Sequence, residues 1–171
     1  MTITYKFLSN GAADLEYLDS LLLLAERAKA GGASPWLYPA ANDFYQNNLK
    51  GHTANVAAFD GDMMVGYGAL RHLVNWPDYL GEPLFLPGQC GLMLVNLVDP
   101  AYRGRGVGTE LARLRLEFAK SLGWQHLYVT VHPANKASVR VLEGLGFETL
   151  DEREIFTEKL LRRIMYMSLS Q

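Results

Sequence analysis

The stretch Asp99-Pro100-Ala101-Tyr102-Arg103-Gly104-Arg105-Gly106-Val107-Gly108-Thr109 joins an apolar run to a segment with helical periodicity. Three glycines alternate with other residues in it, and two arginines flank them. A chain that enters a helix through residues without side chains can point consecutive backbone N–H groups into one concavity, at the positive end of the helix dipole. The stretch therefore predicts a phosphate-binding loop, because a tight turn alone would need only one glycine.

The segments around this loop have the patterns of strands and helices. The run Cys90–Val98 is almost wholly apolar, as expected of a central strand buried on both faces. Apolar residues then recur at helical spacing from Gly106 or Val107 to about Leu122. A strand at 125–131 and a second helix at 135–145 follow, and Asn135 is placed to cap that helix.

The N-terminal half has the order of an antiparallel meander. Ile3, Tyr5 and Phe7 alternate with polar residues, which indicates a short edge strand. A helix follows, for which Asn10 or Asp14 is placed as the cap. The apolar positions of this helix are Leu15, Leu18, Leu22 and Ala25, and Gly31-Gly32 ends it. The other expected elements are a loop at 34–41, a short helix at 43–50, strands at 55–59 and 63–73 joined by Asp60-Gly61-Asp62, and a long connection at 75–89.

The C-terminal segment completes the predicted fold. It is expected to hold a strand at 147–150, a polar connection at 151–162 and a closing strand at 163–169. The order of elements predicts the α+β class, with one mixed, mostly antiparallel sheet of six to seven strands and about four helices. The chain has 171 residues, 49% of them hydrophobic, so residues 1–171 are predicted to form a single domain.

The composition argues against several classes of protein. No stretch approaches the roughly 20 apolar residues of a membrane helix, and the first ten residues lack the pattern of a secretion signal. A cytoplasmic protein with no membrane partner is therefore expected. The single cysteine, Cys90, lies in an apolar run, where a buried inert thiol is expected; it cannot form an internal disulfide, and no metal site is predicted around it. The net charge of -2 gives no general attraction to nucleic acid.

The charges are unevenly distributed along the chain. Residues 34–99 hold six acids against two bases, whereas residues 100–140 hold seven bases against two acids. A solvated helix face could produce such a difference, and so could a polyanion site beside a site for a cation. The counts alone leave both interpretations open.

Two other families with glycine loops fit the sequence less well. A nucleotide-binding P-loop ends in Gly-Lys-Ser/Thr, whereas Gly106 is followed by Val107 and Gly108. A dinucleotide-binding fold needs Gly-x-Gly-x-x-Gly and an acidic residue at the end of the next strand. Here the spacing differs, and that strand ends at Val131-His132 without an acid.

The run Arg103-Gly-Arg-Gly106-Val-Gly108 resembles the Arg/Gln-x-x-Gly-x-Gly/Ala loop of the GCN5-related N-acetyltransferases. The downstream run that begins at Asn135 and ends in Leu145-Gly146-Phe147 resembles a second motif of that family, so the resemblance covers roughly residues 90–147. It implies an enzyme that uses acetyl-CoA as cosubstrate and transfers its acetyl group to an amine.

The resemblance also implies which residues bind the cosubstrate. The backbone amides of Arg103, Gly104, Arg105, Gly106, Val107 and Gly108 would hold the pyrophosphate, and the backbone of Asn96, Leu97 and Val98 would pair with the pantetheine amides. Asn135 would contact the pantetheine arm or the adjacent region. Asn96 is also compatible with a buried amide that neighbouring backbone satisfies.

The catalytic groups are harder to assign. Many family members have a tyrosine acid five residues before the phenylalanine of Gly-Phe, and Leu142 stands at that position here. The sequence instead looks like the subgroup related to ribosomal-protein N-terminal acetyltransferases, in which a serine can face the sulfur. That residue would be Ser138, which could equally complete a helix cap. The candidates for a general base are Asp43, His72, Asp78, Glu82 and His132, none of them singled out.

Recognition of the acceptor is expected from two variable aromatic segments. One contains Trp36, Tyr38, Phe44 and Tyr45; the other is the connection 76–85, whose Asp78 and Glu82 would suit a cationic amine. A homodimer contact is the rival interpretation of this connection. Two alternatives to the transferase also stay open, a non-catalytic acyl-CoA sensor with the same fold and a nucleotide-phosphate enzyme that uses the same loop.

Overall fold

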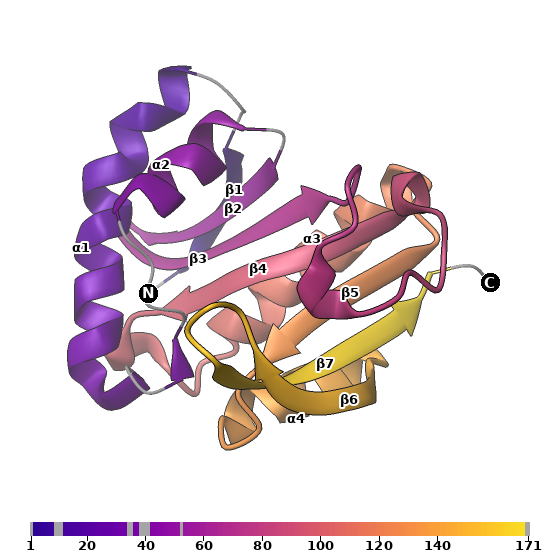
Figure 1. The fold of residues 1–171 in the computed structure, drawn as a ribbon. Helices are drawn as coiled ribbons and strands as arrows, with labels where there is room; N and C mark the ends of the chain where they lie inside the picture. The colour runs from indigo at the N-terminus through magenta and orange to yellow at the C-terminus, as the bar shows by residue number, and fades with distance from the viewer. Residues whose placement is uncertain (1, 9–11, 34–35, 38–41, 52, 170–171) are drawn as a thin grey trace.

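A computed structural model describes residues 2–8, 12–33, 36–37, 42–51 and 53–169. Its seven strands form one sheet in the order β1-β2-β3-β4-β5-β7-β6, in which only β4 and β5 run parallel. The strands are β1 (Thr4–Leu8), β2 (Thr53–Asp60), β3 (Met63–His72), β4 (Cys90–Val98), β5 (His126–Val131), β6 (Glu148–Ile155) and β7 (Leu160–Ser168). The predicted class and strand number are confirmed (Figure 1).

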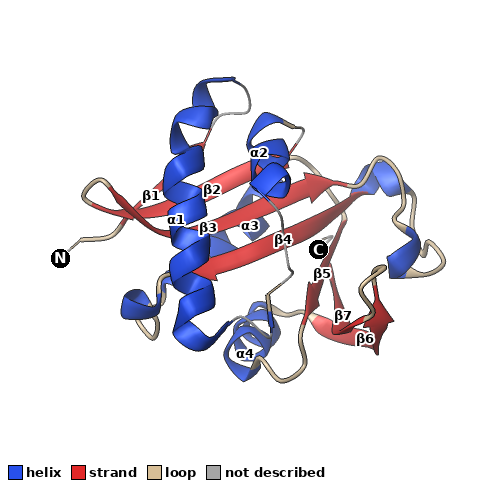
Figure 2. Cartoon of the chain, turned by 60° about the vertical axis from the view of Figure 1, so that its left-hand side comes forward, coloured by secondary structure: helices blue, strands red, loops and turns tan. Residues whose placement is uncertain are grey.

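Four α-helices cover the two faces of the sheet in the described residues. They are α1 (Leu18–Ala28), α2 (Asn42–Lys50), α3 (Val107–Ser121) and α4 (Lys136–Leu145). Figure 2 shows α1 and α2 in front of the sheet and α3 behind it. Short 3₁₀ turns lie at Ala12–Tyr17, Asp78–Leu80, Pro87–Gln89 and Pro100–Tyr102. No helix of the described part is long and apolar enough to cross a bilayer.

The two helical layers bury different sets of side chains. The side chains of α1 and α2 pack with Tyr67 and Ala69 of β3. On the opposite face, α3 lies close to β3 because Gly66 and Gly68 have no side chains. A Cβ at Gly66 would lie 2.8 Å from Val107 of α3. The glycines of β3 therefore set how closely α3 approaches the sheet.

The start of the first helix differs from the prediction. A 3₁₀ turn precedes α1, which begins only at Leu18, and its N-cap Tyr17 makes no side-chain capping bond. Asp14 is therefore not the cap, and Asn10 lies outside the described residues. The buried stripe of α1 consists of Leu21, Leu24, Ala25 and Ala28. The prediction chose a neighbouring stripe because consecutive leucines make the periodicity ambiguous.

The prediction of a polar connection at 151–162 is wrong. Most of it belongs to a hairpin in which β6 pairs antiparallel with β7 from Glu148↔Tyr166 to Ile155↔Leu160. β6 is the edge strand, and all its side chains except Ile155 are exposed. Since neither face of most of β6 is buried, its sequence has no apolar alternation to indicate a strand.

Candidate functional site

The sheet opens between β4 and β5, and this opening is the centre of the site. The two strands pair only from Cys90↔His126 to Met93↔Val129. Beyond that point β4 has a bulge at Val95, whose φ of 56° is in the left-handed region that β-branched residues rarely adopt. The residues of β4 after Met93 therefore have no partner on β5, and a wedge separates the two strands.

The buried guanidinium of Arg115, on α3, holds the bulge in place. It donates to the carbonyl oxygens of Ala69, Leu94 and Val95 at 2.9–3.1 Å and to Oδ1 of Asn96 at 3.0 Å. None of the ion pairs in the described part of the chain includes Arg115. Burial lowers the pKa of Arg115 to about 10, so its charge persists at neutral pH.

The predicted phosphate loop lies at the end of β4. Gly104 and Gly106 have φ of 74° and 81°, which favours glycine, and Gly106 is the N-cap of the 15-residue helix α3. That cap makes no side-chain hydrogen bond, so the first N–H groups of α3 have no capping partner there. Arg103 donates to the carbonyl oxygens of Ala28 and Gly31, which ties the loop to the end of α1.

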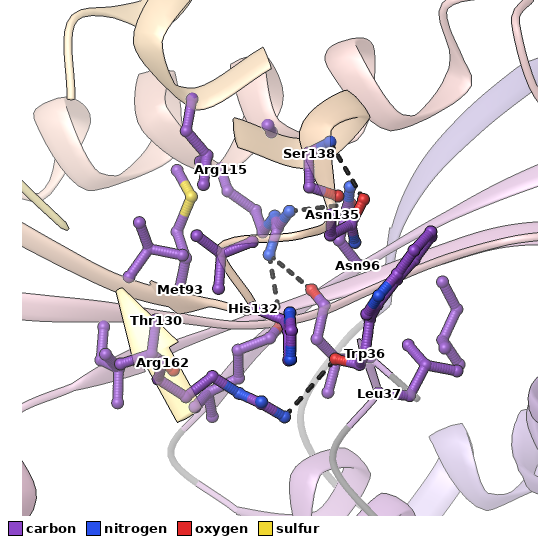
Figure 3. A pocket seen from close by; sticks show the side chains of 18 of the residues that line it. Trp36, Leu37, Met93, Asn96, Arg115, Thr130, His132, Asn135, Ser138 and Arg162 are labelled. Atoms are coloured by element: carbon purple, nitrogen blue, oxygen red, sulfur yellow. Dashed lines mark hydrogen bonds between the residues drawn. The ribbon is translucent and has the colours of Figure 1, made fainter. Parts of the chain in front are cut away.

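A cavity of about 400 Å³ lies in the wedge. Figure 3 shows side chains that line it, from Ser138 and Asn135 at the start of α4 to Arg162 on β7. The lining also includes aromatic and apolar residues of the α1–α2 side of the sheet, namely Trp36, Leu37, Phe44, Tyr45, Tyr79 and Phe156. The cavity therefore reaches groups on both faces of the sheet.

The predicted cosubstrate residues fall into two groups. Asn96, Leu97, Asn135 and Ser138 line the cavity, whereas Val98 and the loop 103–108 are not part of its lining. The amide of Asn96 accepts from a side chain, Arg115, and not from backbone as one interpretation had it.

The start of α4 places two of the predicted residues at the cavity. Asn135 caps α4, since its Oδ1 accepts from the N–H of Ser138 at 3.3 Å. The hydroxyl of Ser138 has no hydrogen bond to another described residue. Leu142, at the position where the family often has tyrosine, also lines the cavity. This helix therefore presents one free hydroxyl, that of Ser138, and an apolar side chain.

Among the candidates for a general base, only His132 lines the described cavity. The N–H of Ala134 donates to Nδ1 of His132 at 3.1 Å, which places the proton of the neutral ring on Nε2. Burial, and then the charge of Arg162, lower the pKa of His132, and Glu152 opposes this effect. His132 is therefore neutral at pH 7, and its Nε2 is a hydrogen-bond donor.

The other candidates lie elsewhere. His72 stacks on Trp124, with ring centroids 4.8 Å apart, and its Nε2 lies 2.8 Å from the carbonyl oxygen of Gly88. Asp43, Asp78 and Glu82 are exposed and are not among the residues that line the cavity. The acidic middle segment thus does not form the expected site for a cation at the cavity.

The aromatic residues predicted for the acceptor side are partly confirmed as cavity residues. Trp36, Phe44 and Tyr45 line the cavity, and Tyr38 lies outside the described residues. From the connection 76–85 only Tyr79 is in the described lining. Trp76 packs on Tyr128 and Phe85 on His126, with ring centroids 5.3 and 3.5 Å apart, so these two half-buried side chains of the connection pack against the core and are not among the described lining residues.

Sequence reasoning missed the three arginines of the cavity, Arg71, Arg115 and Arg162. Arg162 lies in the segment that was expected to be a connection, and Arg115 was counted with the bases of the α3 segment. A signal for Arg115 does exist, because a charged residue stands within the apolar stripe that contains Leu111 and Phe118. Its meaning depends on the bulge in β4, which the sequence does not indicate.

Comparison with known proteins agrees with the predicted fold. The model of the Acetyltransferase (GNAT) family matches residues 18–147. The N-alpha-acetyltransferase RimI of Mycobacterium tuberculosis is 31% identical over 122 residues, which are 71% of this chain and 67% of that protein. For other curated relatives the chain spans less than two thirds of their length, in one case 30%.

Two solved structures have the same fold at low sequence identity. The ribosomal-protein-S18-alanine N-acetyltransferase of Escherichia coli has a TM-score of 0.73 and 19% identity, over 99% of this chain and 96% of its own. The yncA protein of Salmonella typhimurium, solved with its cofactor acetyl-CoA, has a TM-score of 0.69 and 17% identity, over 100% of this chain and 96% of its own.

Proposed function

The chain belongs to the GNAT family of acetyltransferases, and we propose that it transfers the acetyl group of acetyl-CoA to an amine acceptor. The observation that carries the proposal is the wedge between β4 and β5, which opens the sheet beside a glycine loop at the start of α3. A thioester held in the wedge could be reached by an amine from the other face of the sheet. We therefore assign acetyl-CoA as the first substrate.

The residues of the loop fit a diphosphate. Gly104 and Gly106 leave open space where a side chain would stand, and the N-terminus of α3 offers N–H groups and the positive end of its dipole. We assign the pyrophosphate to the backbone of residues 103–108. The pantetheine arm is assigned to Asn135 at the start of α4 and to the backbone of Asn96, Leu97 and Val98, which pairs with β3 but has no partner on β5.

The reaction is direct attack of the neutral amine on the thioester carbonyl. The C–N bond forms, the C–S bond breaks, the amine loses one proton, and the CoA thiolate gains one. Deprotonation at pH 7 costs about 1 to 2 kcal/mol for an amine of pKa near 8 and about 4 to 5 kcal/mol for a lysine-like amine. An amine of pKa near 8 therefore needs little help from a general base. This suits the cavity, because Nε2 of His132 carries the proton of the neutral ring and is a donor, not a base.

We assign to Ser138 the hydrogen bond to the leaving sulfur. Its N–H is used by the cap of α4, and its hydroxyl has no described partner. The residue is also part of the cavity lining, together with Leu142, which has no proton to give. The hydroxyl of Ser138 would thus take the place of the tyrosine hydroxyl that many family members have.

The alternatives are a sensor that binds acyl-CoA without turnover and an enzyme that binds a nucleotide in the same loop. To separate them, purified protein is incubated with acetyl-CoA and a panel of amines while CoA thiol release is measured, and CoA binding is measured by calorimetry. The proposal expects thiol release that depends on the amine. Saturable CoA binding with no turnover on any amine would establish the sensor, and competition by ATP as strong as that by CoA would favour the nucleotide enzyme.

Several finer expectations depend on this proposal. The acceptor is an amine of a small molecule or of a protein N-terminus, in keeping with the subgroup that the sequence resembles. A homodimer contact through the connection 76–85 and a cytoplasmic location stay predictions from the sequence. The described residues contain no cluster of three or more side chains that could hold a metal ion, and none is assigned a role.

A further inference from the structure

The charge of the cavity wall distinguishes between classes of acceptor. Arg71, Arg115 and Arg162 are part of the lining, whereas no Asp or Glu is among the described residues that line it. The stretch 34–41, which contributes Trp36 and Leu37 to the lining, contains no charged residue in its sequence. The cavity is therefore positively charged and otherwise mostly aromatic and apolar.

Arg115 and Arg162 differ in how many of their N–H donors remain available to a ligand. Arg115 donates to five oxygen atoms of the protein, including the carbonyl oxygen of Leu111, so the fold itself uses its donors. Arg162 is 4% exposed and donates only to the carbonyl oxygens of Leu161 at 2.8 Å and Trp36 at 3.4 Å among the described residues. A guanidinium has five N–H donors, which leaves three of Arg162 without a described partner.

Arg162 also lacks the acidic partner that its neighbours have. Arg153, opposite it on β6, lies 3.2 Å from Asp151, and Arg163, next along β7, lies 3.2 Å from Glu152. No ion pair of the described residues includes Arg162. A buried charge without a counter-ion is unfavourable, so an anion that enters the cavity would relieve the cost. A carboxylate matches the planar, two-pronged geometry of the guanidinium.

We infer that the acceptor is an amine that carries a carboxylate, and that Arg162 binds this carboxylate. The inference rests on the proposed acetyl transfer and specifies its second substrate. His132 lies near Arg162 (Figure 3), and its Nε2–H is a second donor on the same side. Trp36, Leu37 and Phe44 suit an apolar side chain on the acceptor, as in an apolar amino acid. A polyamine would instead bring cations toward Arg71 and Arg162.

The test compares matched pairs of acceptors with the wild-type protein. Each pair is an amino acid and its decarboxylated amine, for example phenylalanine with 2-phenylethylamine and leucine with 3-methylbutylamine. A peptide with the same N-terminal residue and spermidine complete the panel. The expected result is a kcat/KM at least about tenfold higher for the best amino acid than for its decarboxylated partner, since a hydrogen-bonded charge pair is lost.

Two variants assign the preference to one side chain. Arg162→Gln should lower kcat/KM for the amino acid to the value for its decarboxylated partner and leave that partner nearly unchanged, and Arg162→Lys should keep part of the preference. Arg163→Gln is the matched control, because its side chain belongs to the same strand but pairs with Glu152 and does not line the cavity. It should leave the ratio within a pair unchanged.

The outcomes separate this inference from the proposed function. Equal or better turnover of decarboxylated amines, spermidine or peptides by the wild-type protein overturns the carboxylate acceptor and leaves acetyl transfer standing. An equal fall for both members of a pair in Arg162→Gln also overturns it, since the side chain would then be structural. CoA binding with no turnover on any amine would refute acetyl transfer and the inference together. Since the wild-type comparison decides alone, the result does not depend on the folding of a variant.

Discussion

Gly68 of β3 and Arg115 of α3 are in a contact that leaves no room for one further carbon atom. An ideal Cβ at Gly68 would lie 2.7 Å from Cζ, 2.8 Å from Nε and 3.0 Å from Nη1 of Arg115. The guanidinium cannot move away cheaply, because it is held by hydrogen bonds to Ala69, Leu94, Val95 and Asn96. We therefore predict that Gly68→Ala is destabilising, and that Arg115 is the cause.

The size of the effect follows from two opposing contributions. A glycine in a strand interior gives way to alanine with a gain of about 0.5–1 kcal/mol when there is space for the methyl group. Forcing an extra carbon atom into a packed core costs about 1–3 kcal/mol. Leucine at position 115 has no Cζ, Nε or Nη1. In an Arg115→Leu background, Gly68→Ala should therefore keep only the favourable contribution of about 0.5–1 kcal/mol. The coupling between the two substitutions should thus be about 1–3 kcal/mol.

The measurement is a double-mutant cycle. The wild type, Gly68→Ala, Arg115→Leu and the double variant are unfolded in urea while the fluorescence of the three tryptophans is recorded. Arg115→Leu alone should also be destabilised, because the bulge carbonyls lose their donor. Free energies that add within about 0.5 kcal/mol would show that the guanidinium does not occupy the space beside Gly68, and the account of the bulge would be wrong.

Four further predictions concern separate parts of the chain. Gly106→Val should weaken CoA binding, measured by calorimetry, at least about tenfold, because Gly106 has a positive φ and its backbone belongs to the proposed phosphate loop. The control is Gly123→Val, which has a similar φ and similar open space outside the loop and should bind CoA normally. Ser138→Ala should lower kcat about tenfold or more with the KM for acetyl-CoA nearly unchanged, which steady-state kinetics measures. Cys90 should resist Ellman's reagent at pH 8 in the native protein and react in guanidinium chloride, because burial raises the pKa of its thiol. Burial lowers the pKa of His126 in the folded state, so its contribution to stability is present above about pH 6.5 and is lost as the pH falls through the folded-state pKa. The urea midpoint of the wild type should therefore fall between pH 7 and pH 5, and it should fall less in His126→Gln.

Features with a local sequence signal were predictable from the sequence. These features are the apolar run of β4, the glycines before α3 and Asn135 at the start of α4. Each of them acts through its own backbone or that of near neighbours. The hairpin between β2 and β3 is of the same kind, since Asp60-Gly61-Asp62 sets its turn. These signals predicted the order of elements around the loop, from β4 through α3 and β5 to α4.

Features that depend on distant partners were not predictable. β6 is exposed and charged, so its strand character comes from pairing with β7 and not from its own pattern. The bulge at Val95 depends on Arg115, which lies 20 residues further along the chain. The acids Asp78 and Glu82 were assigned to the acceptor from composition alone. They are exposed and outside the described cavity lining, in a connection whose Trp76 and Phe85 pack against the core.

The opening in the sheet also bears on the order of bond changes in the proposed transfer. Ser138 and Leu142 line the cavity from α4, on the side of α3, whereas Trp36 and Phe44 line it from the side of α1 and α2. If the cosubstrate lies along α3 and α4, its carbonyl carbon must stand in the wedge for an amine on the other side to reach it. Cys90, the single cysteine, lies in the paired part of β4 and is not among the described lining residues. An acyl-enzyme on this thiol would need the acetyl group to enter the closed part of the sheet, so direct attack by the amine is the route that the geometry favours.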